Sequence, residues 1–206
     1  LHYWLIDATQ KTVSTKKFFT ESSETYVDVD NNLLILQDGK SILRTSEVSG
    51  FNHIYKLGFD GTSTQITTGD WDVIEFLGYD EQVQTVYYTS AEPGAIYKSV
   101  YSIQINGSNK QNLTPVLGYH NVEFLNGMKY FIHNYSNANT PPVISLRKAN
   151  GELVKVLEDN TALLDKMNAE KLSQRKFLSI PTPSVILNAS LIFPTNYDPS
   201  KKYPVF

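Results

Sequence analysis

A turn signal recurs along the chain at nearly constant spacing. The segments Ile54–Gly61, Val100–Gly107 and Val143–Gly151 each end in a glycine that follows Asp or Asn. These glycines are 46 and 44 residues apart, close to the roughly 40–50 residues that one four-stranded blade of a β-propeller occupies. The repeat therefore favours an array of small sheets in which each unit buries an apolar face against the next.

Strand-like segments flank each of these turns. A strand pair precedes each one, at residues 32–36 with 41–45, 74–78 with 85–89, and 121–125 with 129–133. A short strand follows each turn, at 64–67, 111–114 and 153–157. Asp-Gly and Asn-Gly suit a two-residue type I′ hairpin, which needs positive φ at both central positions. We predict three four-stranded antiparallel blades over residues 26–158, and the outer strands of another blade within residues 1–20.

Composition agrees with a mainly β chain. The 13 Tyr and 10 Phe favour strands, since aromatic side chains pack well on a pleated surface. An antiparallel β-sandwich with evenly spaced hairpins is the alternative fold.

After Asn160 the pattern changes. Apolar residues recur there at roughly helical spacing, at Leu163, Leu164, Met167 and Leu172. This spacing predicts one short helix over residues 161–173 behind a capping Asn or Thr. Residues 177–180 and 184–193 then predict a β-hairpin.

Several classes of partner and chemistry are excluded by composition. The net charge is −3 with no basic block, so the chain lacks the charge that neutralises a nucleic-acid backbone. The sequence contains no run of about 18 apolar residues, which is the length that would predict a membrane-spanning helix. The absence of cysteine removes disulfides, thiolate nucleophiles and cysteine metal ligands.

Three segments together resemble one family. Gly69–Val73, Val156–Met167 and Leu191–Phe206, the last containing Asp198-Pro-Ser-Lys-Lys-Tyr-Pro204, resemble segments in the same order in the dipeptidyl peptidase IV branch of the prolyl oligopeptidase family. The resemblance implies that residues 1–160 are the C-terminal part of a β-propeller. It also implies that residues 161–206 are the helix and first strands of a truncated α/β-hydrolase domain.

The catalytic chemistry of that family is not expected within these residues. A Gly-x-Ser-x-Gly nucleophile elbow is absent from the sequence, and its acid and histidine partners would follow it in the chain. We therefore assign no catalytic, cofactor-binding or metal-binding residue, and expect no cofactor. By the resemblance, the paired glutamates that hold a substrate's amino terminus would lie upstream.

Other candidates are assigned structural roles. Glu21 and Glu24 are expected in a solvated loop, and His2, His53, His120 and His133 are expected to be ordinary strand or loop histidines. Lys16–Phe19 is the stretch nearest to a Phe-Arg pair that reaches the substrate cavity in the family; because the arginine is unmatched, that role is not transferred. Trp71 is expected to pack between blades, with Asp70 and Asp72 bonding turn backbone.

The resemblance also implies a function. The parent protein would be a serine peptidase that releases Xaa-Pro or Xaa-Ala dipeptides from peptide amino termini, with a propeller that gates the cavity and is itself inactive. It would act in a periplasm or at a cell surface, as a homodimer. A non-enzymatic propeller scaffold and an acylaminoacyl or oligopeptidase relative are the alternatives. An open arc of blades leaves edge strands unpaired, so self-association is expected.

Overall fold

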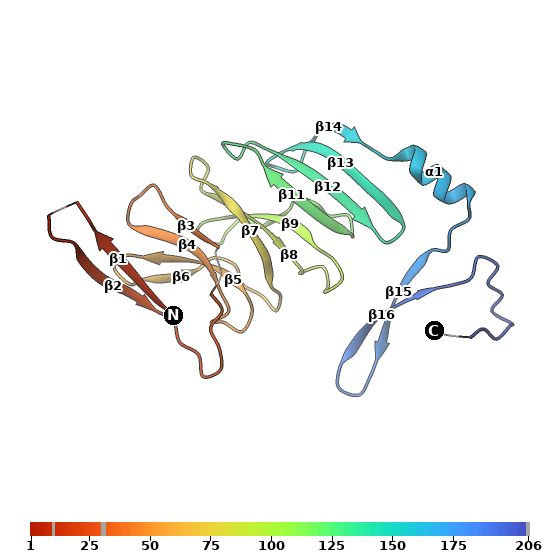
Figure 1. Ribbon diagram of the computed structural model, residues 1–206, viewed down its shortest axis with the longest axis horizontal. Helices are drawn as coiled ribbons and strands as arrows, with labels where there is room; N and C mark the ends of the chain where they lie inside the picture. The colour runs from red at the N-terminus through yellow and green to blue at the C-terminus, as the bar shows by residue number, and fades with distance from the viewer. Residues whose placement is uncertain (10, 30–31, 205–206) are drawn as a thin grey trace.

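The computed structural model describes residues 1–9, 11–29 and 32–204. Within them the strands form three four-stranded antiparallel sheets and two separate hairpins, which follow one another along the chain (Figure 1). The first hairpin is β1 (His2–Asp7) and β2 (Ser14–Thr20). The first four-stranded sheet contains β3 (Leu33–Ile35), β4 (Ser41–Ser46), β5 (His53–Gly58) and β6 (Ser63–Gln65). The second contains β7 (Val73–Asp80), β8 (Thr85–Ser90), β9 (Ser99–Gln104) and β10 (Gln111–Asn112). The third contains β11 (Tyr119–Phe124), β12 (Tyr130–Asn137), β13 (Thr140–Lys148) and β14 (Leu153–Glu158).

The predicted blades are confirmed. In each four-stranded sheet, neighbouring strands pair in the order in which they occur along the chain, which is the up-and-down topology of a propeller blade. The sheets stand face to face in an arc, as Figure 1 shows. The central strands β4 and β8 are buried along their whole length. They are covered on both faces because each sheet has a neighbour on either side.

The core consists of layers between these sheets. The largest layer separates the first and second four-stranded sheets, and its fully buried side chains include Leu43, Ile54, Val86 and Tyr88. A second layer, around Tyr87, Val100 and Leu113, joins the second sheet to the third. A third, around Ile42, Tyr55 and Leu57, receives aromatic rings from the β1–β2 hairpin. Each blade is therefore stabilised mainly by contact with its neighbours.

The three repeated turns have a different conformation from the one predicted. Gly61, Gly107 and Gly151 have φ of 94°, 83° and 86°, whereas Asp60 and Asn106 are not among the residues with positive φ. The type I′ prediction is therefore wrong. In the first turn Gly61 N–H donates to Gly58 O and Gly58 N–H donates to Thr62 O, at 2.9 and 2.8 Å. This is a three-residue loop with a left-handed glycine. In all three turns the side-chain oxygen of the Asp or Asn before the glycine accepts a bond from the backbone N–H two positions later.

The turn glycines also allow close contact between blades. A Cβ on Gly61 would lie 3.1 Å from Phe18 O, one on Gly107 would lie 3.2 Å from Ile66 O, and one on Gly151 would lie 2.9 Å from Leu113 O. Each carbonyl belongs to the outer edge of the preceding sheet or hairpin. The 44–46-residue repeat is thus a repeat of contacts between blades as well as of turns.

The segment after Asn160 contains a helix and a hairpin. Helix α1 spans Thr161–Ala169, so the predicted helix over 161–173 is too long; Lys171 takes a left-handed φ of 49°, which ends the helical backbone. Asn160 is the residue before the helix, but its side chain makes no capping bond and donates to Pro142 O at 2.6 Å. The predicted hairpin is confirmed as β15 (Arg175–Pro181) and β16 (Ile186–Ile192). Val205 and Phe206 lie outside the described residues.

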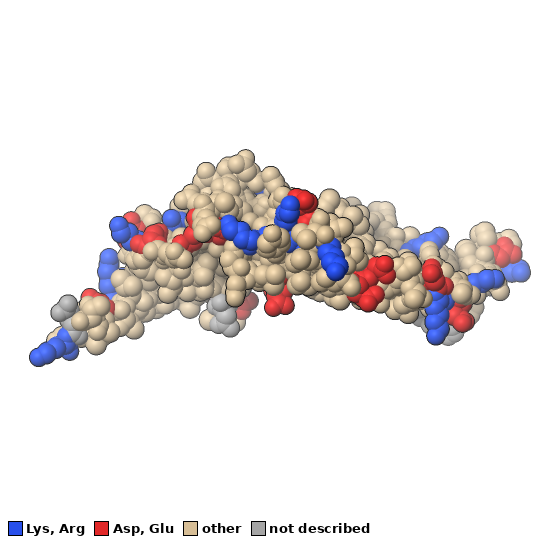
Figure 2. Space-filling view, turned by 90° about the horizontal axis from the view of Figure 1, so that it is seen from above, with Lys and Arg blue, Asp and Glu red and all other residues tan. Residues whose placement is uncertain are grey.

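The outer surface is mixed in charge. Figure 2 shows basic and acidic side chains interspersed along one face of an elongated body. Among the described residues, no helix has the length and apolarity needed to cross a membrane.

Candidate functional site

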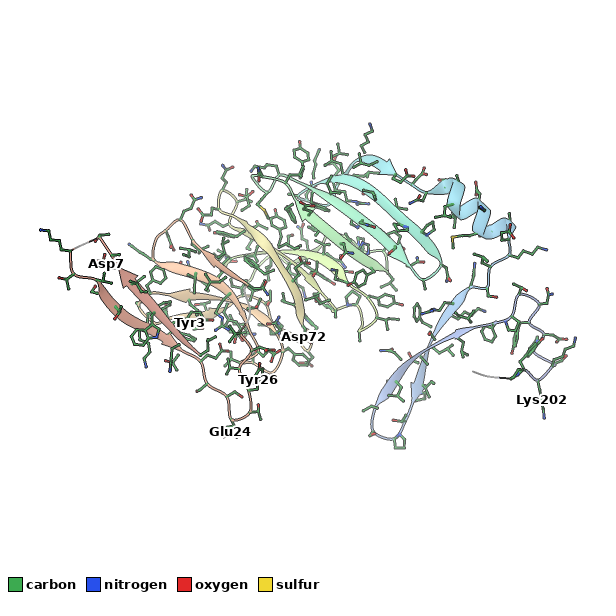
Figure 3. The ribbon with its side chains drawn as sticks, viewed as in Figure 1. Tyr3, Asp7, Glu24, Tyr26, Asp72 and Lys202 are labelled. Atoms are coloured by element: carbon green, nitrogen blue, oxygen red, sulfur yellow. The ribbon has the colours of Figure 1, made fainter. Side chains whose placement is uncertain are left out.

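A hollow of about 530 Å³ opens beside the first four-stranded sheet. Its wall is formed by the segment that joins β2 to β3, by the end of β4 and by the turn between β4 and β5. Figure 3 shows Glu24 and Tyr26 on that segment, below the sheet, and Tyr3 on the adjoining hairpin. The side chains that line the hollow include Glu21, Tyr26, Asp28, Arg44, Glu47 and Asn52.

A buried ion pair closes one side of this hollow. Glu21 and Arg44 are only 8% and 4% exposed, and Arg44 Nη1 donates to Glu21 Oε2. Ser46 Oγ donates to the other oxygen of Glu21, and Arg44 Nε donates to Thr45 O at 2.8 Å. The guanidinium also lies 5.0 Å from the centre of the Tyr3 ring. Both charges are therefore held by several partners, which a buried ion pair requires.

The expectation that Glu21 lies in a solvated loop is wrong. The loop brings Glu21 back over β4, where the buried Arg44 requires a negative partner. Glu24 is exposed, so the two glutamates do not form a pair, and Glu21 is already bonded to a guanidinium. With Asp28 and Glu47 on its wall, the hollow favours groups that are cationic or that donate hydrogen bonds.

The Lys16–Phe19 stretch lies on the far side of the same ion pair. Phe18 and Phe19 pack on Tyr3, and their ring centres lie 6.1 and 6.2 Å from the centre of the Tyr3 ring. Phe19 and Arg44 both line a second hollow of about 220 Å³. The structure thus brings a phenylalanine from β2 beside an arginine from β4.

Two histidines form a hydrogen-bond chain between the second and third sheets. His120 Nδ1 lies 2.8 Å from His133 Nε2, and His120 Nε2 lies 2.7 Å from Val116 O. A carbonyl can only accept, so Nε2 of His120 carries its hydrogen, and Nδ1 accepts from His133. Nδ1 of His133 then accepts from Ser145 Oγ at 3.4 Å, and Arg147 Nε donates to that oxygen at 3.3 Å. Two neutral rings satisfy every bond in this chain.

The surroundings keep both rings neutral. Burial is the main cause that lowers the pKa of His120, and Arg147 adds to the effect. Burial, the charge of Arg147 and the neighbouring His120 together lower the pKa of His133 to about 3. The pair is therefore uncharged at neutral pH.

The other two histidines occupy separate places. His2 Nδ1 lies 3.0 Å from Thr20 Oγ1 on an exposed hairpin. His53 is buried, with Nδ1 3.1 Å from Thr67 Oγ1 and Nε2 2.9 Å from Gly69 O. Within the described ranges there is no group of three His, Asp or Glu side chains that could hold a metal ion.

Trp71 packs between blades, as predicted. Its ring stacks on Tyr88 with centres 6.0 Å apart, and it meets the edge of His53 at 5.0 Å. A Cβ on Gly69 would lie 2.1 Å from Trp71 Nε1, so the Gly-Asp-Trp motif needs its glycine to seat this ring. Asp72 Oδ1 accepts from Asn52 N at 2.7 Å, which ties this linker to the turn of the preceding blade.

The position of Arg44 in the sequence gives one indication of the buried ion pair. Arg44 follows Ile42 and Leu43 in a segment predicted as a strand, and a charge in a buried strand needs a partner. The identity of that partner depends on the path of the loop after β2, which residue spacing does not reveal.

The topology and these contacts define a class of protein. Serial four-stranded meanders, joined face to face through turn glycines, form part of a β-propeller. Residues 1–142 match the family described as "Dipeptidyl peptidase IV (DPP IV) N-terminal region". The chain therefore belongs to this family, and it is an N-terminal propeller fragment of it.

Relatives and solved structures agree with this assignment. A probable dipeptidyl peptidase 4 from Arthroderma benhamiae is 32% identical over 168 residues, which cover 78% of this chain and 21% of the relative. A dipeptidyl peptidase 4 from Arthroderma otae is 28% identical over 97% of this chain and 28% of its own length. The crystal structure of Porphyromonas gingivalis dipeptidyl peptidase 4 superposes with a TM-score of 0.83 at 35% identity, covering 93% of this chain and 28% of that one. The chain thus spans between a fifth and a third of these proteins.

Proposed function

We propose that this chain is the cavity-gating propeller portion of a dipeptidyl peptidase IV-like serine exopeptidase. The whole protein would release Xaa-Pro and Xaa-Ala dipeptides from the free amino termini of peptides. Bond cleavage would belong to a hydrolase domain, and the chain would contribute selection of the substrate. The observation that carries this proposal is the family match over residues 1–142 together with the 0.83 TM-score to the Porphyromonas gingivalis enzyme.

The geometry supports a gating role. The blades are joined by tightly packed layers, and a Cβ on the turn glycines would lie only about 3 Å from the backbone of the preceding sheet or hairpin, so the arc is a rigid wall. The hollow beside Glu21 and Arg44 presents further acidic groups, Asp28 and Glu47. A rigid wall with an acidic lining would admit an extended peptide with a cationic amino end and exclude a folded protein.

We further propose that residues 1–160 and 161–206 belong to different domains. Beyond β14 the chain contacts the third sheet through few bonds, such as the reciprocal pair between Asn139 and the backbone of Arg175 at 2.8 and 3.0 Å. Large apolar side chains on both strands of the β15–β16 hairpin are exposed, among them Phe177, Ile180, Ile186 and Ile192. These side chains would be covered by the rest of an α/β-hydrolase domain.

The location and assembly of the whole protein follow from the same proposal. Like an exopeptidase that acts on peptides outside the cytoplasm, it would work in a periplasm or at the cell surface. It would form a homodimer, and the open arc taken alone would self-associate through its exposed edge strand β14, whose residues are all exposed.

A matrix of chromogenic substrates tests the function. The complete polypeptide that carries these residues would be assayed with Gly-Pro-p-nitroanilide, its N-acetylated form, and N-acetyl-Ala-p-nitroanilide. We expect hydrolysis of the first alone, because the proposed enzyme needs a free amino terminus. Hydrolysis of N-acetyl-Ala-p-nitroanilide would establish the acylaminoacyl relative, and no hydrolysis of any of the three would leave a binding scaffold.

Gating has its own test. The same enzyme would be given an unstructured peptide and a folded domain that begin with the same Xaa-Pro dipeptide. Selective release from the unstructured peptide is expected, whereas equal rates would contradict a gating role for the propeller.

A further inference from the structure

A small pocket lies between the second and third four-stranded sheets, away from the hollow at Glu21. Its volume is about 120 Å³, several times the roughly 10–15 Å³ that one water needs by the same measure. The loop after β10 forms one wall and the faces of β11, β12 and β13 form the other. The polar side chains on this wall are those of Thr114, His120, His133, Tyr135, Ser145 and Arg147.

Arg147 differs from Arg44 in its surroundings. Its Nε donates to Ser145 Oγ at 3.3 Å and its Nη1 donates to Gly151 O at 2.9 Å. A guanidinium has five N–H donors, so these bonds use only part of its capacity. In the part of the chain that the structure describes, no carboxylate lies within ion-pair distance of Arg147. Partial burial removes some of the water around this guanidinium and thereby lowers its pKa.

The groups beside Arg147 cannot neutralise it. His133 and His120 are the titratable rings that face it, and Tyr135 packs on His120 with ring centres 4.9 Å apart. Ser145 Oγ–H already donates to His133 in the chain described above. The pocket thus combines a partly buried cation, hydroxyl groups and empty space, with no anion from the protein among its lining residues.

We propose that this pocket binds a small carboxylate, of the size of formate or acetate, through the guanidinium of Arg147. The planar guanidinium matches a carboxylate with two parallel hydrogen bonds. Thr114 lines the same space, and its hydroxyl oxygen, which accepts from Val100 N at 2.8 Å, retains its own hydrogen as a further donor. Because the pocket lies between two blades, an occupant would also link them, so binding should raise the stability of the protein.

Two carboxylates of different size test this proposal. Sodium formate would replace sodium pivalate at constant total salt while thermal unfolding of the complete polypeptide is followed at pH 7. Formate fits about 120 Å³ with space to spare, whereas pivalate must bring three methyl groups against the polar lining and should bind more weakly, and the ionic strength never changes. We expect the midpoint of unfolding to rise by a few degrees and to saturate.

Matched arginine variants assign the effect to the pocket. Arg147→Gln should abolish the response and Arg147→Lys should weaken it, since lysine keeps the charge but loses the planar fork. Arg175→Gln changes an exposed arginine on β15 and should keep the full response.

Saturation-transfer NMR of the formate proton gives a second readout of binding that does not depend on stability. If Arg147→Gln does not fold, Arg147→Lys replaces it in both measurements. Equal effects of formate and pivalate, or an undiminished response in both Arg147 variants, would overturn the proposal.

Discussion

His120 Nδ1 lies 2.8 Å from Nε2 of His133, with the two ring planes tilted by only 9°. One of the two facing nitrogens must accept, and a protonated imidazole donates from both of its nitrogens, so the bond is lost when both rings are protonated. The direction of the chain is fixed at one end by Val116 O and at the other by Ser145 Oγ. The contact between the second and third blades therefore depends on the protonation state of these rings.

The first prediction is that the protein loses stability in acid because of its two buried histidines. The pKa of both histidines is lowered in the folded protein, to about 3 for His133, while the unfolded chain takes up protons near the ordinary value of about 6.5. The folded protein therefore keeps its full unfolding free energy above about pH 6.5 and loses part of it progressively as the pH falls towards about 3. His133 should lower the unfolding free energy by about 1.4 kcal/mol per pH unit in this window, and His120, whose pKa is also lowered, should act in the same direction.

Urea denaturation between pH 7 and pH 4.5 measures this effect. His133→Gln should reduce the pH dependence, since the amide does not titrate. His2→Gln, at an exposed site, should leave it unchanged. An identical slope in the wild type and in His133→Gln would contradict the prediction.

The second prediction compares two turn glycines. Gly151 and Gly127 have φ of 86° and 80°, so alanine is strained at both, by about 1–2 kcal/mol. A Cβ at Gly151 would also lie 2.9 Å from Leu113 O, whereas a Cβ at Gly127 has nothing within 4 Å. Gly151→Ala should therefore lower the unfolding free energy by about 1–3 kcal/mol more than Gly127→Ala. Denaturant titration of the two variants checks this, and equal losses would show that contact between the blades adds nothing.

The difference between the predicted and observed turns shows what sequence can and cannot reveal. The positions of Gly61, Gly107 and Gly151 follow from local chemistry, because any tight turn at Asp-Gly or Asn-Gly needs left-handed backbone there. The turn type does not follow, since the same dipeptides suit both a type I′ turn and a type I turn with a left-handed glycine. The choice depends on the loop length that brings each glycine against the preceding blade.

The candidate sites show a similar limit. The burial of Arg44 is visible in the pattern of its strand, but Glu21 is 23 residues away along the chain and reaches it only through the tertiary path of a loop. His120 and His133 meet because β11 and β12 pair in one register, in which His133 lies opposite Val122. A shift of one residue would place the rings on opposite faces, and the sequence does not specify this register to a single residue.

The third prediction concerns the ion pair at the hollow. Glu21→Gln leaves the buried Arg44 without a negative partner, and breaking a buried pair costs about 3–5 kcal/mol. Glu152→Gln is the matched control, because Glu152 pairs with Lys148 at 2.9 Å on the exposed surface, where such a pair contributes about 0–1 kcal/mol. A double-mutant cycle of Glu21→Gln with Arg44→Met should show strong coupling between the two sites. Additive losses would mean that the two charges are stabilised independently.

The last prediction concerns a buried hydroxyl. In the described structure, Tyr88 Oη is buried and has no hydrogen-bond partner, and the pKa of Tyr88 is raised by this burial and by the charge of Glu92. Removal of an unpaired buried hydroxyl is nearly neutral or stabilising, so Tyr88→Phe should keep or raise the unfolding free energy. Tyr55→Phe is the control, because Tyr55 Oη donates to Ser49 Oγ at 2.9 Å, and it should lose about 0.5–1.5 kcal/mol. Denaturant titration of both variants measures the two losses. The Oε2 atom of Glu92 also lacks a hydrogen-bond partner in the described residues. A loss at Tyr88 as large as that at Tyr55 would contradict the prediction and indicate an ordered water that bridges Tyr88 Oη and Glu92 Oε2.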